Sequence, residues 1–427
     1  MPPVDLSTAQ TLRRYLPEIA WSILTTLLIL FWILRAHQTW LDAPGLDWNS
    51  SEWMITYRAG FIRRGLGGSS LHFLIRATHL SFFTIWAGLT TAIYAGICLW
   101  FVRSIARLRG PAVWRAALLF NPMFFLFGAA SGTFLRKDML FVAASIAHVE
   151  CARRLRASRS RAFLAGYLVV FAIAATLLAL LHEADFLFVA LAINAALLWR
   201  SLRLFELRRG AAALLLALTL IPSLTAAGAA IIVHGNAAMS RTIRDAWVEE
   251  MPPAYRSESR FPPEVYFLGA NMHDQLRGPE EAAWQAPLFL GSFALLGLIA
   301  ALALPILVPG MSAHRVALLL ILPLLAGLPM GVIVMDWGRW FADIVCCVFP
   351  LLLHPDLVLA SPLTRPRADD HLPGWAIALR NAIQTHPALF AVALVCCPLP
   401  PWPCPNPLLA YNPFFLLLVF GHLLHIV

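Results

Sequence analysis

The chain has 427 residues, of which 60% are hydrophobic and only 13% are charged, and its mean hydropathy is +0.73. Soluble globular domains carry charge on about a quarter of their residues, so this composition excludes a soluble protein and predicts an integral membrane protein. The net charge of +9 does not indicate nucleic-acid binding, because the arginines gather in short loops between apolar segments, where they meet anionic lipid headgroups.

Apolar segments of roughly 20 residues, the length that a bilayer core requires, recur along the chain. We expect membrane spans at 18–36, 81–102, 114–130, 139–152, 163–181, 184–199, 211–233, 286–308, 315–335, 341–360, 385–399 and 408–426. The segment 139–152 is too short to cross the bilayer unless its helix continues beyond the apolar stretch or the segment is re-entrant. Prolines interrupt the last region, so 361–427 is expected to form weakly attached C-terminal spans. The prediction is an all-α, polytopic membrane protein of about 10–12 transmembrane helices in a single transmembrane domain.

Arginine-rich loops set the predicted orientation. Three short connections, RSIARLRGPAVWR, RRLRASRSR and RSLRLFELRR, carry 13 arginines and one acid. Basic residues concentrate in cytoplasmic loops, so we place these loops and the N-terminus in the cytoplasm of a bacterium, with the spans in its inner membrane. The outward segments are then the first outer loop 37–80, the connections 131–138 and 182–185, the long outer loop 234–285, and 336–340.

Charged residues gather at the outward ends of the spans. The stretch SGTFLRKDML (131–140) holds Lys137, which is the only lysine in the chain. DWNSSEWMITYRAGFIRRGLGG (47–68), HEAD (182–185) and DWGRW (336–340) lie on the same predicted side. Ionisable residues at span ends are costly and usually face a polar cavity or one another. The pattern therefore predicts one water-filled, outward-open cavity with both signs of charge.

The basic residues of this region are candidate ligands for a lipid-linked phosphate. Arginine binds phosphate through two parallel hydrogen bonds, and lysine acts as a mobile point charge. The glycines of GFIRRGLGGSS would also let backbone amides approach an anion closely. The predicted substrate-binding residues are Arg58, Arg63, Arg64, Arg136, Lys137, His182, Asp336 and Arg339. The candidate catalytic carboxylates, which would take the proton from an acceptor hydroxyl, are Asp47, Glu52 and Glu183.

Each feature also has a structural interpretation. Charge pairs at span ends often act as salt bridges or anchors. The segment after Arg63 and Arg64 fits an amphipathic interfacial helix equally well, with Leu66, Leu71, Phe73 and Leu74 on its apolar face. The loop 234–285 fits a lid or acceptor-binding loop, or a solvated connector.

HEAD is open to three interpretations. His182 and Glu183 fit a buried pair that braces two helices as well as they fit a catalytic role. Together with Asp185 they could instead ligate a divalent cation, although the spacing matches no strong metal signature. The cofactor is thus undetermined, with a divalent cation as the one candidate.

The outer loop that ends in acidic residues, the charged span ends and the long later outer loop are similar to the GT-C superfamily of membrane glycosyltransferases. Within that group, SGTFLRKDMLFVAASI resembles the Ser…Arg-(Gln/Lys)-x-(Leu/Phe)-Ala segment of EpsG-like and O-antigen-polymerase-like proteins of bacterial polysaccharide assembly. The resemblance covers residues 20–345 loosely. It implies a GT-C-like helical bundle in which Arg136 contacts a lipid diphosphate beside Lys137, and Asp47 or Glu52 takes the place of the first-loop carboxylate.

The chain departs from this pattern in two ways. It has no adjacent acidic pair or Asp-x-Asp in the first outer loop, since Asp47 and Glu52 are five residues apart. It also carries YRAGFIRRGLGG, which matches no well-characterised member.

We therefore expect a glycosyltransferase or polysaccharide polymerase that transfers sugar from a polyprenyl-phosphate or diphosphate carrier to a glycan acceptor at the outer face of the bacterial inner membrane. Its partners would be membrane lipids and other polysaccharide-assembly proteins. One alternative is a lipid-linked oligosaccharide flippase or other transporter, which should place charge at mid-membrane on broken helices; the nearly uncharged span interiors disfavour it. Another is an acyl- or phosphate-group transferase of envelope lipids, with His182 as the base.

Overall fold

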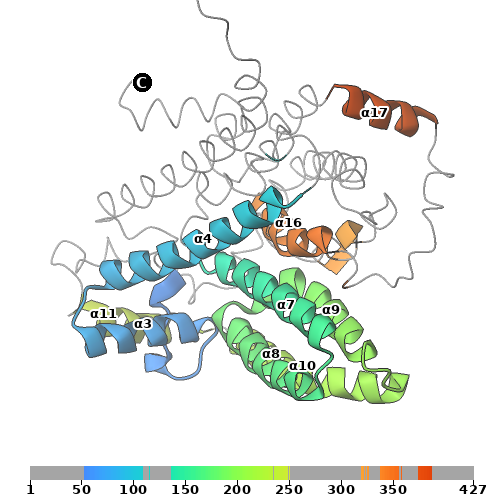
Figure 1. The fold of residues 1–427 in the computed structure, drawn as a ribbon. Coiled ribbons are helices and arrows are strands. Elements are labelled where there is room, and N and C mark those ends of the chain that lie inside the picture. Colours follow the sequence, from blue (N-terminus) through green and yellow to red (C-terminus); the bar gives the residue numbers. More distant parts are fainter. Residues whose placement is uncertain are drawn as a thin grey trace, which may run out of the picture.

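The computed structural model describes residues 52–108, 136–233, 235–248, 337–354 and 374–386, with isolated positions at 115, 250, 319–321, 323, 325, 326 and 357. Within these ranges the chain forms helices and no strand (Figure 1). The helices are η1 (Glu52–Met54), η2 (Tyr57–Ala59), α3 (Gly65–Thr78), α4 (Phe82–Ala106), α7 (Asp138–Ser158), α8 (Arg161–Leu181), η4 (Asp185–Ala190), α9 (Leu191–Arg203), α10 (Arg209–Ile232), α11 (Ala237–Val248), α16 (Trp337–Leu353) and α17 (Gly374–Thr385).

Four helices in the described part are long and apolar enough to cross a membrane: α4, α8, the continuous run of η4 and α9, and α10. They correspond to the predicted spans 81–102, 163–181, 184–199 and 211–233, and they confirm an all-helical membrane protein. The predicted spans 18–36, 114–130, 286–308, 315–335, 385–399 and 408–426 lie wholly or largely outside the described residues.

The predicted short span 139–152 forms part of α7, which is not one of the four helices apolar enough to cross a membrane. α7 runs over 21 residues from Asp138 to Ser158, which at 1.5 Å per residue is about 30 Å and matches the thickness of a bilayer core. The helix continues through the arginine-rich segment RRLRAS because those side chains can extend to the membrane surface. α7 is also central in the fold, since it packs against α4, α8, α9, η4 and α16.

The surfaces of α8 and α10 show that these helices lie at the periphery of the bundle. The two helices pack against each other, and their other faces expose large apolar residues, among them Val169, Val170, Ile173, Leu214 and Leu218. Helices that are apolar on nearly every side are typical of membrane spans. A short turn at Arg159 and Ser160 joins α7 to α8, with the Ser160 hydroxyl accepting the Phe163 backbone N–H at 3.2 Å.

The first outer loop folds into a compact unit at one end of the bundle. The predicted interfacial helix forms as α3, with Leu71 and Ile75 buried. Of the residues on the predicted apolar face, Leu71 is buried in the protein, whereas Phe73 is 70% exposed and Leu74 lies at the surface. The helix packs against η1, η2, α4 and α8.

The described start of the long outer loop packs onto the first outer loop. α11 lies beside α3 (Figure 1), and it contacts η2. The indole of Trp247 is fully buried and its Nε1 donates to the Met54 carbonyl oxygen at 2.7 Å. The segment 235–248 is therefore an ordered part of the outer unit. α17, in the predicted C-terminal region, exposes Trp375, Ile377 and Leu379.

Candidate functional site

Three segments that are distant in sequence bring charged side chains together where α7 begins and α8 ends. η1 contributes Glu52, the start of α7 contributes Arg136, Lys137 and Asp138, and the turn after α8 contributes His182, Glu183 and Asp185. Each of these seven residues is at most 5% exposed. With Arg64, which contacts Glu183, we refer to them as the buried charged cluster. The sequence predicted that these residues would face a cavity or one another, and in the structure they contact one another.

Arg136 connects the first outer loop to α7. Its guanidinium forms an ion pair with the Glu52 carboxylate, and its Nε lies 3.4 Å from Oδ2 of Asp138. Both partners of the Glu52 pair are inaccessible to solvent. A buried arginine between two carboxylates fixes their positions, so the Arg136 charge is already offset by protein groups.

The chain's only lysine is held by the first outer loop. The ammonium of Lys137 lies 5.7 Å from the centre of the Trp53 ring, a cation–π distance, and it donates to the Arg64 carbonyl oxygen at 3.1 Å. Gly67 makes this possible, because a Cβ at that position would lie 3.0 Å from Cε of Lys137. At Gly67, the glycine-rich segment thus allows close approach of a lysine side chain.

Gly68 allows a second close contact, between α3 and η1. A Cβ on Gly68 would lie 2.2 Å from the Ile55 carbonyl oxygen and 2.8 Å from that of Trp53. Any larger residue would push α3 away from the segment that holds Glu52. The two glycines therefore set the position of the first outer loop against the cluster.

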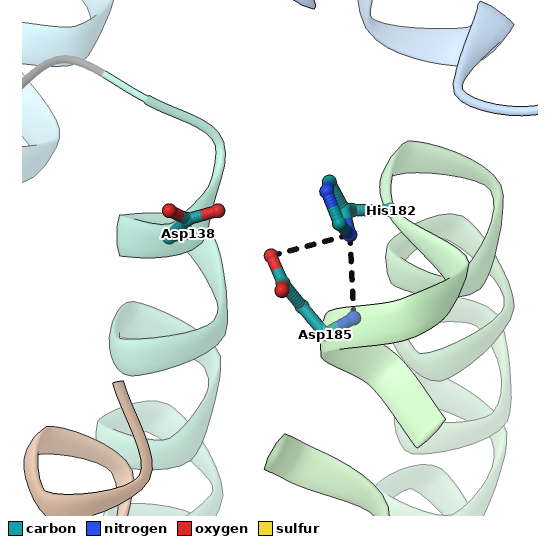
Figure 2. A group of neighbouring side chains, drawn as sticks. All are labelled: Asp138, His182 and Asp185. Carbon is teal, nitrogen blue, oxygen red and sulfur yellow. Dashed lines mark hydrogen bonds and ion pairs between the residues drawn. The ribbon is translucent and has the colours of Figure 1, made fainter. Parts of the chain in front are cut away.

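The turn between α8 and η4 carries the histidine and two of the carboxylates. α8 ends at Leu181, and His182 has an extended backbone with φ −160° and ψ 97°. The chain then enters the π-helical turn η4 at Asp185, a geometry that is often found at functional sites. Figure 2 shows that the side chains of His182 and Asp185 face Asp138 at the start of α7.

Asp138, His182 and Asp185 form a compact group of possible metal ligands. One ligand atom from each residue lies within 4.8 Å of the other two, and all three side chains are buried. Nδ1 of His182 accepts the Asp185 backbone N–H at 3.2 Å and lies 3.4 Å from Oδ2 of the same residue. The sequence named His182, Glu183 and Asp185 as a possible ligand set, and the structure places Asp138 where Glu183 was expected.

Glu183 instead faces Arg64. Its Oε1 lies 3.5 Å from Nε of Arg64, and the Arg64 side chain is 19% exposed. Its other oxygen, Oε2, is buried and makes no hydrogen bond within the described part of the chain. This pair forms the edge of the cluster that reaches solvent.

The model of a protein family described as "Uncharacterised membrane protein Rv1490" matches residues 22–270. The chain belongs to this family. All eight residues of the buried charged cluster lie inside the matched segment, whereas α16 and α17 lie beyond it. Comparison with curated proteins and with solved structures gives no match.

Other predicted site residues do not join the cluster. Arg58 is exposed on η2. Arg63 is half-buried, and its backbone N–H donates to the Val233 carbonyl oxygen at 3.1 Å, which ties the first outer loop to the end of α10. Asp47, Asp336 and the side chain of Arg339 lie outside the described residues.

A second polar group on the outer unit was not predicted from the sequence. Nε2 of His72 lies 3.0 Å from Oε1 of Glu250, which also lies 3.5 Å from Nε of Arg76. Burial lowers the pKa of His72; the Glu250 carboxylate opposes this shift, while Arg58 and Arg76 add to it. The residues are 178 positions apart, and nothing in the local sequence indicates that they meet.

Tyr57 illustrates how closely this outer unit packs. A Cβ added to Gly65 would lie 2.4 Å from two ring carbons of Tyr57. Burial raises the pKa of the Tyr57 hydroxyl to about 12. Tyr57 therefore stays neutral at physiological pH. It contributes packing to the first outer loop, and no charge to the cluster.

Proposed function

We propose that this chain is a membrane glycosyltransferase or polysaccharide polymerase of GT-C type that transfers sugar from a polyprenyl-phosphate or diphosphate carrier. One observation carries the proposal: acids, bases and a histidine from three distant segments meet at the ends of apolar helices. Buried ionisable groups in membrane proteins are costly and are usually retained for function. Their position at helix ends, with the span interiors nearly uncharged, favours group transfer at a membrane surface over transport through the bilayer.

Arg64 is the cation best placed to meet the substrate phosphate. The guanidinium is partly exposed and stands next to Glu183, whereas Arg136 and Lys137 are buried and contact protein groups. A guanidinium can bind two phosphate oxygens at once. Arg136 and Lys137 would act through their electrostatic field, which stabilises negative charge on the leaving phosphate without direct contact.

Glu183 is the carboxylate best placed to act as the general base. Glu52 is engaged by Arg136, so we assign it a positioning role, while Oε2 of Glu183 is open to accept a proton. In the transfer step the acceptor hydroxyl oxygen bonds to the anomeric carbon, and the bond from that carbon to the phosphate oxygen breaks. The phosphate leaves with the electron pair and the hydroxyl proton passes to Glu183.

The arginine-rich loops 103–115, 153–161 and 200–209 define the proposed orientation. With these loops in the cytoplasm, the cluster would face the outside of a bacterial inner membrane, where lipid-linked sugars and growing glycans meet. The N-terminus would be cytoplasmic. The glycan acceptor and other polysaccharide-assembly proteins would approach from the side of the first outer loop.

Lipid binding tests the proposal. Purified protein in nanodiscs would be titrated with polyprenyl phosphate and diphosphate, and the variants Arg64→Gln and Lys137→Met would be compared with the exposed control Arg58→Gln. Removing one positive charge, either the contact made by Arg64 or the field of Lys137, should weaken binding by about tenfold, and Arg58→Gln should bind like the wild type. Equal affinities in all four proteins would contradict a lipid-phosphate site at the cluster.

A further inference from the structure

We propose that Asp138, His182 and Asp185 bind a divalent transition-metal ion, such as Mn²⁺ or Zn²⁺. The two carboxylates and the imidazole come from facing elements, the first turn of α7 and the turn between α8 and η4, and they point toward one another (Figure 2). The site is argued from these side chains and does not depend on the lipid-phosphate proposal.

The spacing of the three groups is close to that of ligands around one ion. Metal–oxygen and metal–nitrogen bonds of about 2.1 Å place neighbouring ligand atoms about 3.0 Å apart and opposite ones about 4.2 Å apart. In the structure one atom from each residue lies within 4.8 Å of the other two, and Nδ1 of His182 is 3.4 Å from Oδ2 of Asp185. Small side-chain rotations would close the group around an ion.

The contact between His182 and Asp185 itself indicates a cation. A neutral ring nitrogen either accepts a hydrogen bond or donates one. Because Nδ1 of His182 accepts the Asp185 backbone N–H, its contact with the Asp185 carboxylate brings two electron-rich atoms together. A proton shared between Nδ1 and the carboxylate oxygen, or a metal ion at the pair, would remove this repulsion.

The charge balance favours the metal ion over a single proton. In the described part of the chain, five carboxylates are buried, Glu52, Asp138, Glu183, Asp185 and Asp343, but only two cations, Arg136 and Lys137. Asp343 lies on α16, which packs against α7 and η4, and both Asp343 and Asp138 interact electrostatically with the Tyr94 hydroxyl. Even with the partly exposed Arg64 counted, the buried carboxylates outnumber the cations among the described residues. A divalent ion at the three ligands would offset two negative charges, and a proton on His182 only one.

The donor set determines the class of ion. Carboxylate oxygens alone suit Mg²⁺ and Ca²⁺, whereas an imidazole nitrogen favours first-row transition metals. Arg136, 3.4 Å from Oδ2 of Asp138, would orient this ligand from outside the coordination sphere. Three protein ligands leave coordination positions open, which phosphate oxygens could fill; this last role rests on the proposed function.

The test measures metal binding in the absence of lipid substrate, so that its outcome is independent of the lipid titration. Tag-free protein in nanodiscs would be stripped with a chelator and titrated with Mn²⁺, followed by electron paramagnetic resonance, and with Zn²⁺, followed by calorimetry. We expect one ion per chain, with nitrogen coupling to the bound Mn²⁺ from the imidazole of His182. Asp185→Asn and His182→Gln should each reduce the affinity by about 100-fold, and the nitrogen coupling should disappear in His182→Gln.

Glu250→Gln provides the matched control, since it removes a carboxylate from the other histidine–carboxylate pair. Its affinity should equal that of the wild type. If a variant fails to fold, the wild-type titration still decides. Absence of stoichiometric binding of either ion, absence of nitrogen coupling, or equal affinities in all folded variants would overturn the proposal and leave a proton on His182 as the balancing charge.

Discussion

Replacing Arg136 by methionine should destabilise the protein strongly. The guanidinium is 2% exposed, pairs with Glu52 and lies 3.4 Å from Asp138. Methionine would fill most of the volume but would leave two buried carboxylates without their shared cation. Removing one partner of a buried ion pair costs about 3–5 kcal/mol, because the remaining charge stays desolvated. Glu52→Gln should cost less than Arg136→Met, since Arg136 would keep Asp138 as a partner.

The same helix offers a control pair. Arg153 and Glu150 of α7 form a salt bridge of 2.9 Å, but both side chains are about one-third exposed. Surface ion pairs contribute about 0–1 kcal/mol, so Arg153→Met should have a small effect. The free energy of unfolding would be measured in bicelles by steric trapping for the three single variants and for Arg136→Met combined with Glu52→Gln.

The double variant carries the sharpest expectation. Arg136→Met leaves two buried carboxylates without their shared cation, and Glu52→Gln replaces one of these carboxylates by a neutral amide. The double variant should therefore be destabilised by less than the sum of the two single variants. Equal costs for Arg136→Met and Arg153→Met, or strict additivity of the two cluster substitutions, would refute the description of Arg136 as the shared partner of two buried carboxylates.

Three further predictions concern the outer unit. Gly68→Ala should lower the thermal stability, because its Cβ would lie 2.2 Å from the Ile55 carbonyl oxygen; an unchanged melting temperature would contradict this packing. Trp247→Phe should cost about 1–3 kcal/mol of unfolding free energy, since the buried Met54 carbonyl loses its donor, and a neutral result would refute that hydrogen bond. Burial lowers the pKa of His72 below the ordinary 6.5, so the unfolded chain binds this proton first and stability should fall as the pH drops below about 6.5; removing this histidine as His72→Gln should flatten that dependence.

Four of the membrane-spanning helices were predictable from the sequence because the bilayer restricts the possible folds. A helix must satisfy its own backbone hydrogen bonds in lipid, so apolar segments such as 81–102 and 163–181 could be assigned directly. The helix α7 was harder to predict. Its arginine-rich end does not look apolar, yet the helix extends through it because arginine side chains reach the headgroups.

The composition of the cluster was predictable, but the contacts within it were not. Placing Arg136, Lys137, His182 and Glu183 on one membrane face follows from span counting and the arginine-rich loops. Their partners depend on side-chain directions that the sequence does not encode. Neighbouring residues such as His182 and Glu183 point to different partners, and so Asp138, 44 positions before His182, completes the group of possible ligands.

The glycine-rich segment shows a similar limit. Glycines beside arginines fit an anion-binding loop in sequence, and they equally fit a backbone that must accept a close neighbour. The structure shows close protein neighbours, Lys137 at Gly67 and the Ile55 carbonyl at Gly68. Only the three-dimensional arrangement distinguishes these two uses of the same residues.

Analysis of lipid-linked sugars in the organism that encodes the chain tests the central claim most directly. Membrane lipids would be extracted from a deletion strain and from strains complemented with the wild type, with Glu183→Gln, or with Glu150→Gln. Glu150 does not belong to the cluster and serves as the control. A transferase that consumes a polyprenyl-linked sugar predicts that this lipid accumulates in the deletion and Glu183→Gln strains and falls to its normal level with the wild type and Glu150→Gln. An unchanged pool of lipid-linked sugars in the deletion strain would contradict the proposed function.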